Sequence, residues 1–259
     1  MKLDGKIAVV TGGSRGIGLG IVDSLLAEGS VVVMVGRNPD TAEQVIAERN
    51  LGPRLSFVQA DVSQPGGAAS AIDAAVAQHG RLDILVNNAG GSGHFKPLTE
   101  FTDDMWRELF ALNLDSAFWA MRHAIPIMKA GGGGRIVNIS SMRAKKQAAT
   151  QGPYGAAKAA LNALTKSTAL EVGDFNITVN AICVGVVLTD LARSGSRLFA
   201  ANQGITEEEL WRRYATEQMP SRQLQTPETM GALVVYFCSD AGRSISGAAW
   251  SADGGLADY

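Results

Sequence analysis

The sequence has few cysteines and little that marks a secreted protein. Its 259 residues include two cysteines, Cys183 and Cys238, which stand far apart in apolar segments without metal-type spacing. We interpret them as buried thiols of a reducing compartment. The first residues run directly into an expected strand and lack the layout of a signal peptide. These features predict a cytoplasmic protein.

Other absences exclude whole classes of partner. Lysine and arginine number 23 against 25 acidic residues, a formal net charge of −2, so no basic surplus exists to neutralise nucleic-acid phosphates. The apolar stretches are far too short to span a bilayer. The three histidines, His79, His94 and His123, are scattered without ligand spacing. We therefore expect no nucleic acid, no membrane and no metal among the partners, and a small molecule as substrate.

What the sequence does have is a regular alternation of strand-like and helix-like segments. Strands are expected at 6–11, 31–35, 55–60, 82–87, 135–140, 177–182 and 248–252. Helices are expected at 16–28, 40–50, 66–79, 102–130 and 153–173, with two more in 206–240. Nearly continuous apolar strands that alternate with helices predict an α/β fold with a parallel sheet covered on both faces.

No linker is long enough to divide the chain, so residues 1–259 are expected to form one domain. The polar stretch 190–220 contains no expected strand, and insertions of this length are often lids. We predict a substrate lid there. Its Trp211 and Tyr214 can serve packing or can stack against substrate.

A glycine loop, "TGGSRGIG", follows the first strand and opens the first helix. Gly12, Gly16 and Gly18 allow a tight turn and a close approach of the backbone, and the helix N-terminus offers free N–H groups to a pyrophosphate. The same loop could cap a helix in any α/β protein. Its place in the first strand–turn–helix unit favours a dinucleotide site.

The choice of cofactor depends on the end of the second strand. Dinucleotide folds place an acid there to hold the ribose 2′-OH of NAD, whereas an arginine accommodates the 2′-phosphate of NADP. This chain has Gly36 followed by Arg37, and Arg15 stands inside the glycine loop. Two guanidiniums favour NADP, because arginine pairs strongly with phosphate. Both arginines could instead be merely solvated, and Asp40 could still approach the ribose of NAD.

A tyrosine and a lysine stand four residues apart in "GPYGAAKAAL". Pro153 and the alanines that follow predict a helix, on which Tyr154 and Lys158 share one face. A free phenol titrates near ~10, and an ammonium ~4 Å away would lower that pKa by at most roughly three units. The pair is therefore expected to form an acid suited to neutral pH. The alternative is an exposed pair without function.

These motifs occur together with others in a set order. After the TGxxxGxG loop come "DV" at 61–62, "NNAG" at 87–90 and an asparagine, Asn113, in an apolar helix. Ser141 then stands thirteen residues before Tyr154, and "DGG" closes the series at 253–255. The chain resembles the short-chain dehydrogenase/reductase family from about residue 4 to 256. The resemblance implies a single Rossmann-type, doubly wound parallel sheet of about seven strands, and assembly as a homo-oligomer, usually a tetramer.

The resemblance also implies roles for individual residues. Tyr154 would be the general acid in carbonyl reduction, Ser141 would bind the carbonyl oxygen, and Lys158 would hold the nicotinamide ribose. Asn113 would anchor a water chain to Lys158, although a local kink would also explain it. The cofactor-binding residues would be Gly12, Ser14, Arg15, Gly16, Ile17, Gly18, Arg37, Asp61, Val62, Asn88, Ala89, Gly90, Tyr154, Lys158, Val187 and Thr189. In that set, Asp61 and Val62 would contact the adenine. Val187 and Thr189 would fix the carboxamide.

The implied function is an NADP(H)-dependent oxidoreductase that interconverts a carbonyl and a secondary alcohol. A 3-oxoacyl thioester reductase is one specific form of this function. A catalytically silent NADP-binding sensor is the alternative, against which the complete Asn-Ser-Tyr-Lys set argues. The loop after Ser141 carries Arg143, Lys145 and Lys146. It is either a solvated basic loop or a site for an anionic substrate or a carrier's phosphopantetheine.

Overall fold

Seven strands form one parallel sheet in a computed structural model of the chain. The structure describes residues 1–257, and for residues 190, 191, 194, 195, 198 and 199 it describes the backbone alone. The strands are β1 (Ile7–Thr11), β2 (Val31–Gly36), β3 (Leu55–Gln59), β4 (Ile84–Asn87), β5 (Gly134–Ser141), β6 (Ile177–Val184) and β7 (Ala249–Ala252). Their order is β3-β2-β1-β4-β5-β6-β7, and every neighbouring pair is parallel. The predicted α/β fold with seven strands is confirmed.

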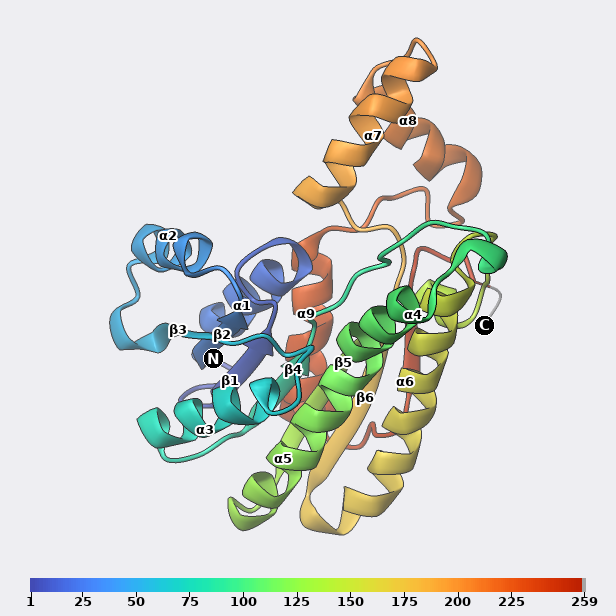
Figure 1. Ribbon diagram of the computed structural model, residues 1–259. Helices are drawn as coiled ribbons and strands as arrows, with labels where there is room; N and C mark the ends of the chain where they lie inside the picture. The colour runs from blue at the N-terminus through green and yellow to red at the C-terminus, as the bar shows by residue number, and fades with distance from the viewer. Residues whose placement is uncertain (258–259) are drawn as a thin grey trace.

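Helices cover both faces of the sheet (Figure 1). One apolar cluster joins the sheet to α1 (Gly16–Ala27), α2 (Pro39–Arg49) and α9 (Pro227–Cys238). A second cluster joins the opposite face to α3 (Gly67–His79), α5 (Ser116–Ala130) and α6 (Gly152–Val172). Burial on both sides explains why the strands are continuous runs of valine and isoleucine.

Helices α1 and α9 pack unusually closely, although they lie far apart in the sequence (Figure 1). A Cβ added to Gly20 would lie 2.6 Å from the carbonyl oxygen of Pro227. A Cβ added to Gly231 would lie 2.5 Å from the carbonyl oxygen of Gly20 and would also meet Ser24. The two glycines therefore let the helix backbones touch, which fixes α1 and the glycine loop at its N-terminus.

The predicted helix over 102–130 is interrupted. The structure has α4 (Asp103–Phe110), a π-helical turn (Ala111–Asp115) and then α5. No glycine or proline stands in this turn to mark the break. The turn carries the buried side chain of Asn113, which donates to the Leu109 carbonyl oxygen at 3.0 Å. Such π-turns frequently occur at functional sites.

The stretch 190–220 forms a separate projection above the carboxyl ends of the strands (Figure 1). It contains α7 (Asp190–Asn202), α8 (Glu207–Arg213) and a π-helical turn (Tyr214–Gln218). Its two ends meet where Val187 bridges to Gln225 and the Leu188 N–H donates to the Gln225 carbonyl oxygen at 2.9 Å. This closed base makes the projection a discrete unit. Its role as a lid stays a prediction.

Within the described residues, no helix combines the length and the apolar character needed to cross a membrane.

Candidate active site

The glycine loop lies at the carboxyl end of β1, where the strand order reverses between β2 and β4. Gly12 and Gly16 have φ angles of +64° and +54°, which glycine adopts without strain. A Cβ on Gly18 would clash with the Gly12 carbonyl oxygen and would lie 2.6 Å from Asn88 Nδ2. No side chain caps the N-terminus of α1, and its first turn has no acid. The loop and this helix end therefore fit an anionic pyrophosphate.

A side-chain latch holds the glycine loop against the end of β4. The Thr11 hydroxyl oxygen accepts the N–H groups of Asn88 and Ala89, each at 3.0 Å. The Asn88 amide donates in return to the carbonyl oxygens of Thr11 at 2.9 Å and Gly12 at 3.1 Å. The side-chain amide of Asn88, predicted among the cofactor-binding residues, therefore shapes the loop. Thr11 was missing from the predicted site, although it stands in the TGxxxGxG motif.

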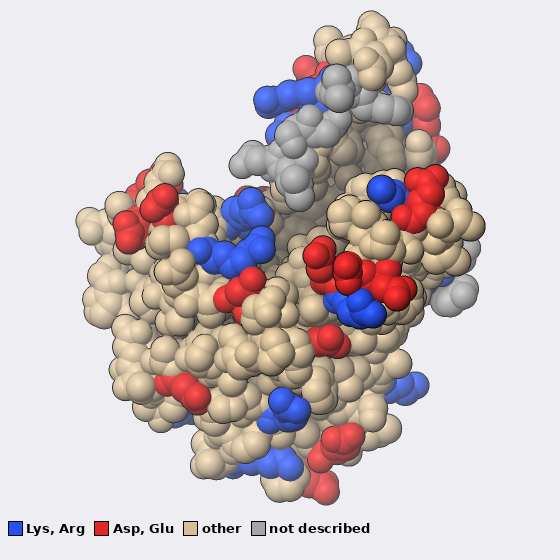
Figure 2. Space-filling model, viewed as in Figure 1, with Lys and Arg blue, Asp and Glu red and all other residues tan. Residues whose placement is uncertain are grey.

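Two arginines lie near the end of β2 without acidic partners. Arg15 and Arg37 are exposed, and none of the described carboxylates lies within 4.0 Å of either guanidinium. The Ser14 hydroxyl lies 3.9 Å from where a Cβ on Gly36 would stand, so the loop faces this strand end. Figure 2 shows Lys and Arg side chains gathered on the α1–α2 side of the hollow below α7 and α8.

Asp61 and Val62 follow β3 at the same sheet edge. The Asp61 carboxylate accepts the Ser63 hydroxyl at 2.6 Å and the Ser63 N–H at 3.0 Å. The hydrogen bond from the Ser63 hydroxyl, with a smaller contribution from the charge of Arg37, holds the Asp61 pKa below its ordinary value. Val62 is buried. Asp61 is therefore ionised at neutral pH.

Thr189, one of the two residues predicted to fix the carboxamide of the cofactor, lies against the glycine loop. Thr189 caps α7, its hydroxyl oxygen accepting the Ala192 N–H at 3.2 Å. The Thr189 methyl group lies 3.3 Å from where a Cβ on Gly16 would stand. Val187 is buried at the base of the projection, and Ile17 packs on the core. Residues far apart in the sequence thus lie against each other at the N-terminus of α1.

Ser141, Tyr154 and Lys158 come together where β5 ends and α6 begins. The Ser141 hydroxyl lies near enough to the Tyr154 phenol to lower the pKa of that phenol. The Lys158 ammonium donates to the Ile139 carbonyl oxygen at 3.0 Å, and its Nζ lies 5.9 Å from the centroid of the Tyr154 ring. Tyr154 is half-buried and Lys158 is fully buried. The structure therefore brings the predicted proton donor, its serine and its lysine to one place.

Asn113 reaches the same place from the π-helical turn. A Cβ on Gly90 would lie 2.9 Å from Asn113 Oδ1 and 3.1 Å from Lys158 Nζ, so both atoms border one small space. Asn113 Oδ1 accepts the Gly91 N–H at 3.1 Å, and its amide donates to the Gly91 carbonyl oxygen at 2.9 Å. These bonds fix Asn113 beside Lys158 and tie it to the "NNAG" segment.

The protonation states differ from the sequence prediction. Burial raises the pKa of Tyr154 above its ordinary value, and the Ser141 hydroxyl and the charge of Arg143 only partly oppose this. Burial also lowers the pKa of Lys158 to about 8. The expectation that Lys158 brings the Tyr154 phenol to a neutral pKa is therefore wrong for this structure. Burial is the largest cause of both shifts.

Two of the three cations in the basic loop after Ser141, Lys145 and Lys146, fit neither of its predicted interpretations. Lys145 Nζ donates to the Ala249 carbonyl oxygen at 2.8 Å and to the Ser251 hydroxyl at 2.9 Å. Lys146 Nζ donates to the Leu256 carbonyl oxygen at 2.8 Å. The two lysines anchor β7 and the segment after it, so they are neither merely solvated nor turned toward a substrate.

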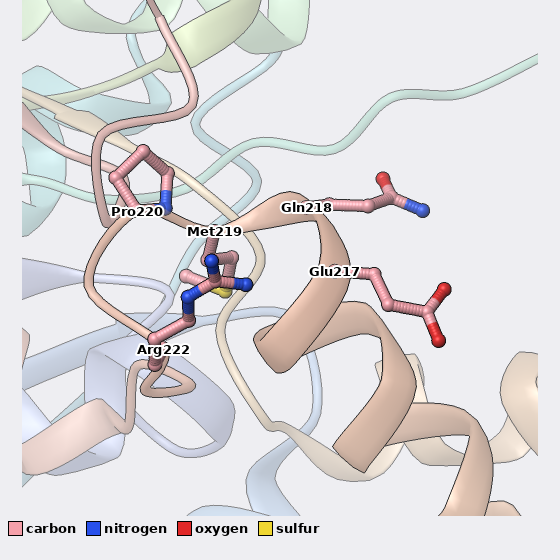
Figure 3. Close-up of a pocket in the computed structure, with 5 residues that line it drawn as sticks. All are labelled: Glu217, Gln218, Met219, Pro220 and Arg222. Carbon is pink, nitrogen blue, oxygen red and sulfur yellow. The ribbon is translucent and has the colours of Figure 1, made fainter.

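Two further hollows lie in the projection, away from this site. A cavity of about 460 Å³ lies between α7 and α8; it is lined by Leu188, Arg193, Glu207, Glu208, Trp211, Arg212 and Leu224. A smaller one of about 170 Å³ lies after the Tyr214–Gln218 turn, where Glu217 and Gln218 extend away from Met219 and Pro220 (Figure 3). Neither hollow is lined by a predicted catalytic residue.

The doubly wound sheet and the glycine loop at a helix N-terminus define a dinucleotide-binding protein of the α/β class. Residues 6–197 match the short chain dehydrogenase family, and the chain belongs to that family. It is accordingly an oxidoreductase that interconverts a carbonyl and an alcohol.

Similar proteins span nearly the whole chain. The D-beta-hydroxybutyrate dehydrogenase of Cupriavidus necator is 39% identical over 254 residues, which cover 98% of each chain. The 3-oxoacyl-acyl-carrier-protein reductase of Chlamydia pneumoniae is 34% identical and covers 99% of this chain and 98% of its own. The solved L-sorbose reductase of Gluconobacter frateurii, in complex with NADPH and L-sorbose, matches all of both chains with a TM-score of 0.94 at 31% identity.

Proposed function

We propose that the protein uses NADPH to reduce a ketone to a secondary alcohol, with Asn113, Ser141, Tyr154 and Lys158 as its catalytic group. The observation that carries the proposal is the meeting of these four side chains at the carboxyl ends of the central strands, beside the glycine loop. Bound NADPH would supply the hydride that adds to the carbonyl carbon.

The side chains would handle the developing charge and the proton. The Ser141 hydroxyl would donate a hydrogen bond to the carbonyl oxygen as negative charge grows on it. The Tyr154 phenol would transfer its proton to that oxygen. Because its pKa is raised, Tyr154 is protonated at neutral pH, the form that reduction requires. Lys158 and Asn113 would bind a water molecule in the space beside Gly90 and return a proton to Tyr154.

We further propose that NADP is preferred over NAD. The supporting observations are the two exposed guanidiniums of Arg15 and Arg37 without acidic partners among the described side chains, and the absence of an acid at the end of β2. A phosphate on the adenosine ribose would complete an ion pair there, whereas a free 2′-OH would find no carboxylate at that strand end. NADPH in the complex of the L-sorbose reductase agrees with this assignment.

The remaining expectations concern the lid, the substrate, the location and the oligomeric state of the protein. The projection over 190–220 is proposed as the substrate lid, and 3-oxoacyl thioesters remain among the candidate substrates. The cytoplasm is proposed as the location on the sequence features alone. A homotetramer is proposed because exposed apolar side chains on the outer helices, such as Trp106 at 42% and Leu170 at 83% exposure, would be covered by other subunits.

A fluorescence titration tests the cofactor assignment. Arg37→Ala should raise the dissociation constant of NADPH by roughly 10- to 100-fold, the effect of losing hydrogen bonds to a charged group, and should leave that of NADH unchanged. Arg243→Ala, an exposed arginine beyond α9, is the control and should change neither. Equal wild-type affinities for NADPH and NADH would contradict the assignment.

Turnover tests the chemistry separately. The absorbance of NADPH would be followed with an acetoacetyl thioester and with simple ketones. Tyr154→Phe should abolish the loss of absorbance while NADPH still binds. Tight NADPH binding by the wild type without turnover on any carbonyl would instead support a silent sensor.

A further inference from the structure

Gly155, the residue after Tyr154, is a glycine that its own backbone does not require. It stands in the first turn of α6, and its φ angle is not positive. Glycine is less favourable than alanine within a helix, and the next two residues of α6 are alanines. The reason for this glycine therefore lies in what packs against the helix.

The side chain of Gln147 occupies the place of the missing methyl group. A Cβ added to Gly155 would clash with Gln147 Oε1, and it would lie 2.9 Å from the carbonyl oxygen of Arg143. The Gln147 amide donates to that same carbonyl oxygen at 2.7 Å. One exposed carboxamide therefore joins the loop after β5 to the first turn of α6, next to the catalytic phenol.

The contact with Arg143 extends to the catalytic serine. The Arg143 N–H donates to the Ser141 hydroxyl oxygen at 3.1 Å. A hydroxyl has one hydrogen and two lone pairs, so this bond leaves the Ser141 hydrogen for the carbonyl oxygen of a substrate. Gln147 thus fixes the residue that orients the Ser141 hydroxyl on one side and touches the helix of Tyr154 on the other.

The loop that carries Gln147 is tightly wound and includes a strained residue. The N–H groups of Lys145 and Lys146 both donate to the Met142 carbonyl oxygen, at 2.9 and 2.8 Å. Thr150, between Gln147 and α6, has a φ angle of +65°, which a β-branched residue adopts at a cost in free energy. Such a conformation persists only where the structure around it holds it. We therefore expect the loop to relax when the Gln147 hydrogen bond is lost.

We propose that Gln147 is a positioning residue that sets the placement of Ser141 relative to Tyr154, and that Gly155 is present to admit it. The inference rests on the proposed function, in which both side chains donate to one carbonyl oxygen. Gln147 acts through the backbone of Arg143 and through α6, without touching the substrate. Its effect on the rate follows from geometry, because a misplacement of about 1 Å can slow a reaction by roughly 100-fold.

Turnover with NADPH and the best carbonyl substrate of the wild type tests this role. Gln147→Ala should lower kcat by roughly 10- to 100-fold and change KM and the Kd of NADPH by less than about twofold, because the groups that it places act in the transition state. Gln147→Glu keeps the shape but has no N–H to donate, and should lose as much. Gln44→Ala is the matched control and should change nothing, although its amide also donates across four residues, to Glu48 at 2.9 Å.

A double-mutant cycle tests whether the two residues form one contact. Gly155→Ala alone should lower kcat to a similar extent, because its methyl group displaces the Gln147 carboxamide. The double variant should then be no more than about threefold slower than the slower single variant. Effects that multiply in the double variant would show independent roles and would overturn the proposal. A raised KM with unchanged kcat in Gln147→Ala would assign Gln147 to substrate binding and would overturn it as well.

Unfolding with denaturant separates this inference from the proposed reaction, because it requires no turnover. Gly155→Ala should lower the midpoint denaturant concentration in the wild type and leave it nearly unchanged in Gln147→Ala, where the methyl group meets less and alanine favours the helix. That result without turnover of any carbonyl by the wild type would overturn the reaction and leave the contact standing. Turnover by the wild type with unchanged kcat in Gln147→Ala and Gln147→Glu would overturn the positioning role alone.

Discussion

Gly90→Ala would test the space that Asn113 and Lys158 share. The new methyl group would stand 2.9 Å from Asn113 Oδ1 and 3.1 Å from Lys158 Nζ, both closer than ordinary van der Waals contact. Asn113 cannot move aside without straining its bonds to Gly91 and Leu109, and Lys158 is held by a carbonyl oxygen. Overpacking of this kind costs about 1–3 kcal/mol, which lowers Tm by roughly 2–10 °C in a chain of this size.

The catalytic effect should exceed the effect on stability. A displacement of catalytic groups by a fraction of an ångström to 1 Å lowers a rate by up to roughly 100-fold. We therefore expect kcat to fall by about 10- to 100-fold while the Kd of NADPH changes little. Gly91→Ala is the matched control, because a Cβ there meets nothing within 4 Å. If both variants lost activity equally, or if Gly90→Ala kept full activity, the shared space would have no part in proton return.

Two further perturbations follow from buried or bridging charges. The pKa of Lys158 is lowered to about 8 by burial, against ~10.4 when unfolded, so its charged form destabilises the fold below pH 8 and this cost disappears as the pH rises through 8–10. Relative to wild type, Lys158→Met should therefore gain about 2.5 kcal/mol more in the free energy of unfolding at pH 7 than at pH 10, measured with denaturant. A pH-independent difference would contradict the desolvation of Lys158. Glu207→Gln removes the ion pair that joins α8 to Arg197 of α7. Hydrogen exchange in α7 should then become faster, and KM for the carbonyl substrate should rise several-fold. The affinity for NADPH should not change. Glu209→Gln, which breaks pairs within the α8 region only, should do neither, and identical behaviour of the two variants would refute the lid.

The fold was predictable because its signals are local and repeated. Each buried strand is a short β-branched run, and the glycine loop marks the first strand–turn–helix unit. The interruption at 111–115 was not predictable from composition, because its cause is tertiary: Asn113 finds its partners in Gly91 and in the preceding turn. Nothing in the residues around it indicates that a π-turn will place its amide beside Lys158.

The site was predictable as a set of residues but not as a set of charges. Spacing alone placed Tyr154 and Lys158 on one helix face. It gave no measure of how far both would be withdrawn from water, which decides the direction of each pKa shift. Likewise, three cations in one loop look alike in sequence. Only the position of the C-terminal carbonyl oxygens separates Lys145 and Lys146 from Arg143.

The contact between Gly20 and Gly231 has a consequence for how the chain is made. Helix α1 emerges from the ribosome early, but its partner α9 is encoded about 200 residues later. At roughly 5–20 residues per second, the bare backbone groove of α1 waits about 10–40 s for the helix that covers it. During that interval the glycine loop is attached to a helix, α1, that lacks its packing partner. Completion of the cofactor site is therefore delayed until almost the entire polypeptide has been synthesised, and a chain truncated before α9 would lack the support for a loop whose own sequence is intact.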